Sequence, residues 1–174
     1  MGLDALFRPQ SARRRKIARH LYDQIMAAAL SPELYRQGLA QDTLDGRFEQ
    51  VALHASLVMR RLRDEDEPGR ALAAELQREV FSGFDYGLRE TGVGDSTISR
   101  KVRALGERFY GLARGLDAAI GSDAPNAMID LIRRNGLAPD AEARLAEYLK
   151  SAAQHLGDVD RETILSGQVD WPRL

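Results

Sequence analysis

The segment whose residue types come closest to a catalytic or phosphate-binding loop is Gly92-Val93-Gly94-Asp95-Ser96. A dinucleotide-binding loop needs a third glycine and a preceding strand, whereas the pattern that precedes this segment is helical. A serine hydrolase needs a strand-to-helix elbow and a base, and no histidine lies nearby in the sequence. We therefore interpret Gly92 to Asp95 as a tight corner between two helices, with Ser96 in the first turn of the second.

The three histidines are not spaced as metal ligands. His20, His54 and His155 are far apart, and no HExxH or ExxH motif places two ligands on one helical face. The chain has no cysteine, which excludes disulfides, thiolate zinc sites and cysteine nucleophiles. We predict no metal site and no cofactor.

Carboxylates can act as acid-base catalysts where an apolar setting shifts a pKa. Asp64 and Asp66 lie in a charged linker, which predicts solvated side chains. Asp45 and Glu49 lie in the first turns of a predicted helix, where acids favour the helix dipole, and helical geometry turns His54 away from both. We therefore predict that the protein is not an enzyme.

The predicted helix over 42–62 is apolar on two faces. Leu53 and Leu57 lie opposite its main apolar stripe, so the helix is either central in the core or partly covered by a partner. These two leucines are candidate contact residues under the second interpretation.

A second feature of this helix is a row of basic residues. Arg47, His54 and Arg61 are spaced by two helical turns, which aligns them at the border of the apolar face. They form either a structural ion-paired edge or a docking edge for an acidic or polar partner. The residues predicted to contact a protein partner are therefore Arg47, Leu53, His54, Leu57 and Arg61.

The first twenty residues carry the strongest local charge, with six basic residues against one acid, a net charge of +5 with histidine neutral. Apolar residues precede this basic cluster, an arrangement that suits an anionic membrane surface or ribosomal RNA. A solvated tail leading into the first helix explains it equally well. The predicted contact residues are Arg13, Arg14, Arg15, Lys16 and Arg19.

The composition indicates one sizeable core, since the chain has 174 residues and 44% hydrophobic content. Its 25 basic and 26 acidic residues nearly cancel, so we predict no specific DNA partner. The N-terminus lacks a secretory signal, and no segment is apolar enough to span a membrane. Together with the absence of cysteine, this favours a reducing compartment.

Apolar residues recur at three- and four-residue spacing, and no long stretch alternates with period two, which predicts an all-α protein. We expect a flexible N-terminal segment over 1–10 and a single helical domain over 11–174, a bundle of about six to seven helices. Gly106, Gly111 and Gly115 lie inside one helix and indicate close packing or a distortion near Gly111. The helices are predicted over 11–30, 42–62, 72–88, 98–120, 125–135 and 140–156, with a short turn over 32–35.

Two separate blocks resemble the ubiquinol-cytochrome c chaperone family. The first is Thr43-Leu44-Asp45-Gly46-Arg47-Phe48-Glu49, followed by Leu53-His54, and the second is Leu88-Arg89-Glu90-Thr91-Gly92-Val93-Gly94-Asp95. Phe109-Tyr110-Gly111 and Gly167-Gln168-Val169-Asp170-Trp171-Pro172 extend the resemblance over nearly the whole chain. One departure is Ser96, which stands where the family usually has an aliphatic residue.

The resemblance implies a non-enzymatic assembly chaperone that binds newly made cytochrome b, as the apo-protein or an early intermediate of the ubiquinol-cytochrome c reductase. It also implies contact with the membrane or ribosome and a small helical partner protein. Because no long targeting extension is present, we expect a bacterial-type member, cytoplasmic and peripherally associated with the inner face of the cytoplasmic membrane. The alternative hypothesis is a lipid- or isoprenoid-binding helical protein of the respiratory membrane, which would need an apolar pocket on the order of several hundred Å³.

Overall fold

A computed structural model describes residues 4–90 and 95–174, and for 4–9 and 95–98 it gives the backbone alone. All regular elements within these ranges are α-helices, six longer ones and two of five residues, so the predicted all-α bundle is confirmed. The predicted corner at Gly92 to Asp95 lies outside the described residues except for the backbone of Asp95. The helices are α1 (Asp4–Ala29), α2 (Pro32–Arg36), α3 (Leu44–Arg63), α4 (Glu67–Glu90), α5 (Asp95–Ile120), α6 (Ala127–Arg134), α7 (Glu142–Asp158) and α8 (Arg161–Leu165).

Helix α3 forms the centre of the bundle. Every residue from Phe48 to Met59 is buried, because α1, α4, α5 and α7 all pack against this helix. Its start is fixed by Thr43, whose hydroxyl accepts a hydrogen bond of 3.0 Å from the Gly46 amide. Of the two interpretations of this helix, a central position in the core is confirmed.

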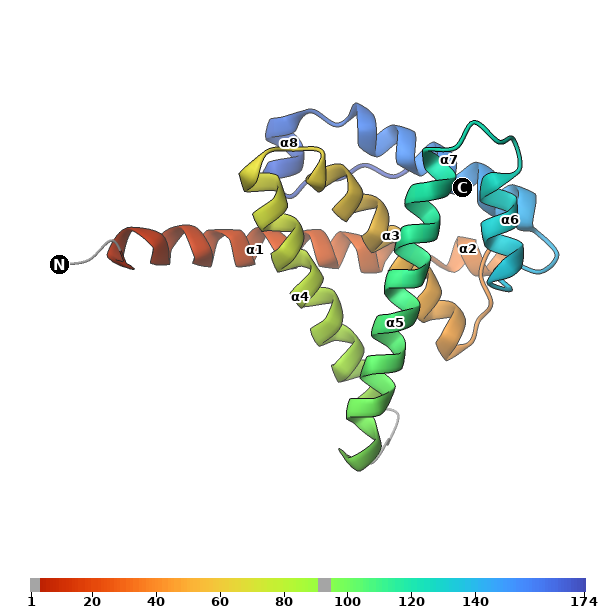
Figure 1. Ribbon diagram of the computed structural model, residues 1–174, viewed down its shortest axis with the longest axis horizontal. Helices are drawn as coiled ribbons and strands as arrows, with labels where there is room; N and C mark the ends of the chain where they lie inside the picture. The colour runs from red at the N-terminus through yellow and green to blue at the C-terminus, as the bar shows by residue number, and fades with distance from the viewer. Residues whose placement is uncertain (1–3, 91–94) are drawn as a thin grey trace.

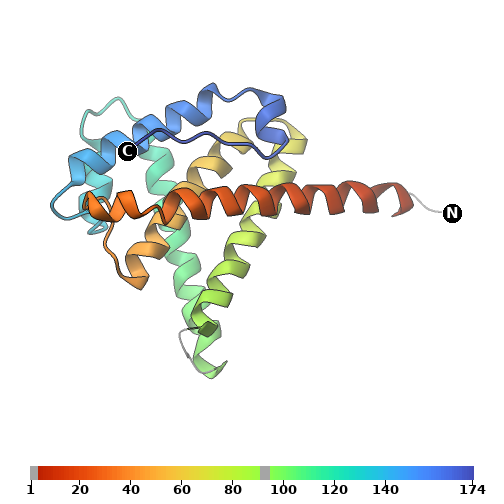
Figure 2. The same ribbon diagram turned by 180° about the vertical axis from the view of Figure 1, so that it is seen from behind.

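Helices α4 and α5 form an antiparallel pair that extends away from the rest of the bundle (Figure 1). Helix α1 crosses behind this pair in Figure 1 and in front of it in Figure 2, and its N-terminal end projects past the other helices. Two glycines of α5 allow close approach: a Cβ on Gly106 would meet the Phe81 ring, and one on Gly115 would meet the Leu131 side chain. The predicted close packing is confirmed at these two positions, while Gly111 is exposed and the helix continues through it.

Helix α1 begins at Asp4 rather than at Ser11, so Ser11 is not its N-cap. The helix therefore extends into the segment over 1–10 that the sequence predicts to be flexible. Its apolar face begins near Ile17 and continues through the buried Leu21 and Ile25. The charged and polar residues before Ile17 extend the helix because arginine, lysine, glutamine and alanine all have high helix propensity.

After α8 the chain runs alongside α1 without regular structure (Figure 2). The Gln24 side chain holds this tail from both sides, donating to the Gly167 carbonyl at 2.6 Å and accepting from the Val169 amide at 3.3 Å. Gly167 has a φ of +89° and lies against Ile17, a combination that only glycine adopts without strain. The tail then places the Trp171 ring on the core.

Candidate functional site

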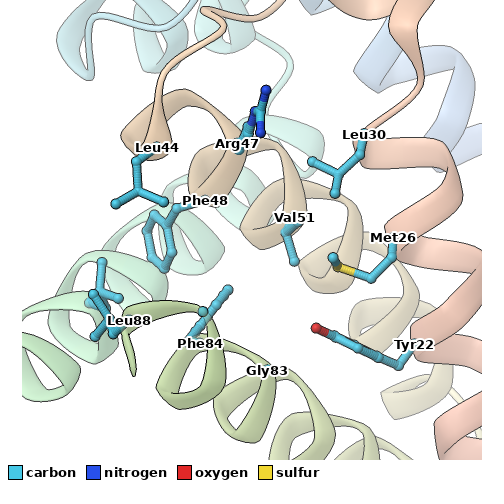
Figure 3. A pocket seen from close by; sticks show the side chains of 12 residues that line it. Tyr22, Met26, Leu30, Leu44, Arg47, Phe48, Val51, Gly83, Phe84 and Leu88 are labelled. Atoms are coloured by element: carbon cyan, nitrogen blue, oxygen red, sulfur yellow. The ribbon is translucent and has the colours of Figure 1, made fainter. Parts of the chain in front are cut away.

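A groove of about 150 Å³ with a mostly apolar lining lies where α1, α3, α4 and α5 meet. Side chains of α1 approach it from one side, and Phe48 and Phe84 approach from the other (Figure 3). We call this hollow the apolar groove. Its lining residues are Tyr22, Met26, Leu30, Leu44, Arg47, Phe48, Val51, Gly83, Phe84, Gly87, Leu88 and Leu105.

Two glycines one turn apart form the α4 wall of the apolar groove. A Cβ on Gly83 would overlap the Tyr22 phenol, so this glycine lets α1 and α4 approach closely. A Cβ on Gly87 would meet no atom within 4 Å. Since Gly87 lines the groove, its missing side chain is part of what keeps the hollow open.

Packed aromatic rings hold the floor of the groove. The Phe48 and Phe84 ring centroids are 4.6 Å apart, and Phe84 in turn lies 6.2 Å from Phe109. Tilted and edge-to-face contacts at such distances add to the stabilisation from burial alone. Met26 lines the groove opposite these rings and has a flexible side chain that adapts to different occupants.

The rim of the groove carries one exposed apolar residue and one charge. Leu44 is 58% exposed although it stands in the first turn of α3. Among the described residues that line the groove, Arg47 alone is charged, and both its Nε and its Nη2 donate to Oδ1 of Asp42, at 2.9 and 2.6 Å. The arrangement therefore suits binding to an apolar group rather than chemistry on it.

The acids beside the groove form an internal ion pair and not a catalytic cluster. Arg108 contacts Glu49 and lies 3.5 Å from Asp45, with its guanidinium 5.8 Å from the centre of the Phe48 ring. Burial raises the pKa of Glu49, while the Arg108 charge opposes that rise. His54 contacts neither acid, since its ring nitrogens bond to other groups.

Comparison with known proteins decides the family. The family model described as ubiquinol-cytochrome C chaperone matches residues 36–171. The protein is a member of the ubiquinol-cytochrome c chaperone family. The predicted resemblance is thereby confirmed, and with it the assignment to a group of chaperones and assembly factors.

Two relatives of this family member are informative. Ubiquinol-cytochrome-c reductase complex assembly factor 1 of Xenopus laevis is 24% identical over 147 residues, which are 82% of this chain and 74% of that protein. A crystal structure of the Cbp3 homolog from Brucella abortus superposes with a TM-score of 0.85 at 29% identity, covering 99% of this chain and 97% of that one. The whole helical bundle is therefore shared with a family member.

The two sequence blocks that resemble the chaperone family meet at the apolar groove. Leu44, Arg47 and Phe48 come from the first block, and Leu88 comes from the second. They are about forty residues apart in the chain, and the fold brings them to one hollow. Part of the resemblance therefore maps to the lining of this site.

The contact residues predicted on the far side of α3 are in the core. Leu53, His54 and Leu57 are almost completely inaccessible to solvent, because α3 is covered on all sides. The Nδ1 of His54 lies 2.7 Å from the Gln50 carbonyl and its Nε2 lies 2.8 Å from the Tyr148 hydroxyl. A partner could contact these three side chains only if the core opened.

The predicted row of Arg47, His54 and Arg61 is not a continuous edge. Arg61 forms an ion pair of 2.6 Å with Glu65 and donates to the Val159 carbonyl, so it connects α3 to the end of α7. Arg47 alone among the five predicted contact residues lines the apolar groove. The row is interrupted because His54 is buried and Arg61 is largely covered, so Arg47 is the exposed member.

The N-terminal basic residues lie on the projecting part of α1. Arg13, Arg15 and Lys16 are exposed and form no ion pair within the described residues. Arg14 is partly covered near the start of α4, and Arg19 pairs with Asp23 and Glu79. The structure thus leaves three of the five predicted cations available to an anionic surface.

Neither a metal centre nor a membrane span is present in the described ranges. No group of three histidine, aspartate or glutamate side chains there is placed to hold a metal ion. No helix among the same residues is both long and apolar enough to cross a bilayer.

Most residues of the groove could not be predicted from the sequence, because they have the same spacing as ordinary core residues. Tyr22 and Met26 continue the apolar stripe of α1, and Phe84 continues that of α4. The sequence contains one indication of the groove, because two glycines, Gly83 and Gly87, lie one turn apart within a predicted helix and beside an aromatic residue. A second indication is Leu44, a large apolar residue that directly follows the N-cap of α3.

Proposed function

We propose that this protein is a non-enzymatic assembly factor that binds newly made cytochrome b for the ubiquinol-cytochrome c reductase, and that the apolar groove holds part of this client. The observation that carries the proposal is the convergence of the two family-resembling blocks on the groove lining. A hollow with an aromatic floor and a single charged residue suits an apolar segment of a membrane protein before that segment is inserted.

The size of the groove sets the strength of the interaction. Burying one large apolar side chain contributes about 1.5–3 kcal/mol, which by itself gives weak and reversible binding. The client would therefore be released as its own helices pack together, without nucleotide hydrolysis. A second helical protein that covers the exposed Leu44 would strengthen the complex, in line with the small partner that the family resemblance implies.

We place the protein in the cytoplasm, peripherally attached to the inner face of the membrane. Arg13, Arg15 and Lys16 support this location, since each exposed cation near an anionic bilayer contributes about 1 kcal/mol. This contact would hold the groove close to the site of cytochrome b insertion.

The alternative of a lipid- or isoprenoid-binding protein is less well supported. Pockets for such ligands are about 300–1,000 Å³, whereas the apolar groove has about 150 Å³. A hollow of this size accommodates roughly one aromatic ring.

The experiment that tests the proposal is affinity capture of a tagged copy from mildly solubilised membranes, with cross-linking and mass spectrometry. Three forms are compared: wild type, Gly87→Leu, which fills the groove, and Gly111→Leu, a matched change on the exposed face of α5. We expect wild type and Gly111→Leu to enrich cytochrome b, with cross-links near the groove, and Gly87→Leu to lose it. Capture of cytochrome b by Gly87→Leu at the wild-type level would place the client elsewhere, and its absence from all three would reject the client.

A further inference from the structure

We propose that the apolar groove recognises one large apolar side chain on a partner helix that also carries an aspartate or glutamate within one turn, bound by Arg47. This inference rests on the proposed function, because it names the chemistry of the segment that the groove accepts. It goes further by assigning sequence specificity to a charge at the rim.

The volume of the groove suits one anchoring side chain. An enclosed apolar cavity of about 150 Å³ holds a single benzene ring, and the groove has the same volume, so phenylalanine, leucine or methionine fits. The hollow lies at the surface, where Leu44 is exposed at its rim, so the anchoring side chain can enter from a backbone that stays outside.

The α4 wall favours a helix as the carrier of this side chain. Gly87 leaves an open position without a Cβ on α4, where another backbone can approach closely, whereas the Tyr22 phenol already fills the space over Gly83. The exposed Leu44 lines the same groove and offers a second apolar contact. An amphipathic helix lying in an apolar groove satisfies both features.

The charge of the partner follows from the unused donors of Arg47. An arginine has five N–H donors, and Asp42 accepts from Nε and Nη2 through one oxygen only. The Nη1 group makes no hydrogen bond within the described residues. A second carboxylate can therefore bind the guanidinium without displacing Asp42, and such charge-assisted bonds are stronger than neutral ones.

The acids near the rim do not line the groove, whereas Arg47 does. Asp45 and Glu49 already face Arg108, and Asp42 faces Arg47. A lysine on the partner would meet the guanidinium of Arg47 at the groove mouth, which is unfavourable. The groove therefore discriminates between an acid and a base on the partner helix.

The test uses labelled helical peptides of about twenty residues, a length at which an alanine-rich helix forms in water. Each peptide carries one central phenylalanine and one glutamate placed three or four residues before or after it. Matched peptides replace the phenylalanine by alanine or the glutamate by lysine. Binding is followed by fluorescence anisotropy at low salt, because exposed charge contacts are screened at high salt.

We expect at least one phenylalanine–glutamate peptide to bind and to weaken at least tenfold with either replacement. Gly87→Leu should abolish binding, and Arg47→Glu should reverse the preference so that the lysine peptide binds better. Arg36→Glu is the matched control, since Arg36 is an exposed arginine paired with Glu33 away from the groove. It should leave the preference unchanged.

The proposal is overturned if no peptide of the set binds, if lysine and glutamate peptides bind wild type equally, or if Arg47→Glu keeps the wild-type preference. These outcomes are separate from the capture of cytochrome b. If the peptides bind with charge selectivity but cytochrome b is not captured, the proposed specificity of the groove stands and the proposed client is rejected. Capture without charge selectivity would keep the client and reject the role of Arg47.

Discussion

The α-carbon of Gly46 lies directly against the main-chain carbonyl of Gln41, so closely that a Cβ at this position would overlap the carbonyl oxygen. This contact folds the segment before α3 back onto its first turn. Leu44 and Arg47 stand on that turn and form the rim of the apolar groove. The position of the rim therefore depends on having glycine, which has no Cβ, at position 46.

Gly46→Ala should destabilise the protein by about 2 kcal/mol, because a rigid backbone group cannot move aside as a flexible side chain can. Urea unfolding measures the change. Gly111→Ala is the control, and it should stabilise by about 0.5–1 kcal/mol, since Gly111 lies in a helix with no neighbour in the way. Equal gains in the two variants would contradict the contact with Gln41.

His54 should make the stability depend on pH. Burial lowers its pKa from 6.5 to about 4, so the unfolded chain binds a proton between these values that the folded chain does not. Stability should therefore fall as the pH drops from about 6.5 to about 4, by about 3 kcal/mol, and then level off with respect to this group. Unfolding free energies of wild type and His54→Gln, compared from pH 7 to pH 4, check this. Parallel curves would show that folding leaves the pKa of His54 unchanged.

Trp171 should tolerate one change and not another. Its ring centroid lies 4.9 Å from that of His54, while its buried indole N–H has no hydrogen-bond partner among the described residues. Trp171→Phe keeps an aromatic ring and removes the unpaired donor, so it should change stability by less than about 1 kcal/mol. Trp171→Ala should cost about 3 kcal/mol through the lost packing. Thermal unfolding of both variants measures these changes in stability. A large loss of stability in Trp171→Phe would indicate that the indole N–H forms a hydrogen bond.

Charge reversal on α1 should weaken membrane association. The triple change of Arg13, Arg15 and Lys16 to glutamate removes three cations of α1 that are exposed and unpaired within the described part of the chain. Co-sedimentation with vesicles containing anionic lipid should fall at least tenfold. Added salt should likewise reduce the co-sedimentation of the wild-type protein.

The control for this experiment reverses Arg100, Lys101 and Arg103, which are equally exposed cations of α5. This variant should sediment like the wild type. Unchanged sedimentation of the α1 variant would rule out a role of these cations in membrane contact. Salt-sensitive binding of wild-type protein to RNA would instead indicate that the cations contact the ribosome.

Local pattern predicted the helices well and the site poorly. The spacing of Leu72, Leu76 and Val80 was sufficient for α4, and Pro32 correctly marked the start of α2. The bond between His54 and Tyr148 joins residues 94 positions apart, so no local spacing could reveal that this histidine belongs to the core. Tertiary packing also decides which apolar residues of a stripe are left uncovered, as the exposed Leu44 and the buried Leu53 demonstrate.

The bonds of Gln24 to Gly167 and Val169 span 143 and 145 residues, an unusual reach for a helical bundle, whose contacts are mostly local. Closing so long a loop is slow compared with pairing neighbouring helices such as α4 and α5. We therefore expect the tail to dock in a late kinetic phase, after the central helices have assembled. Until that step, the His54 ring lacks the cover of Trp171, so indole fluorescence during refolding should report the completion of the core.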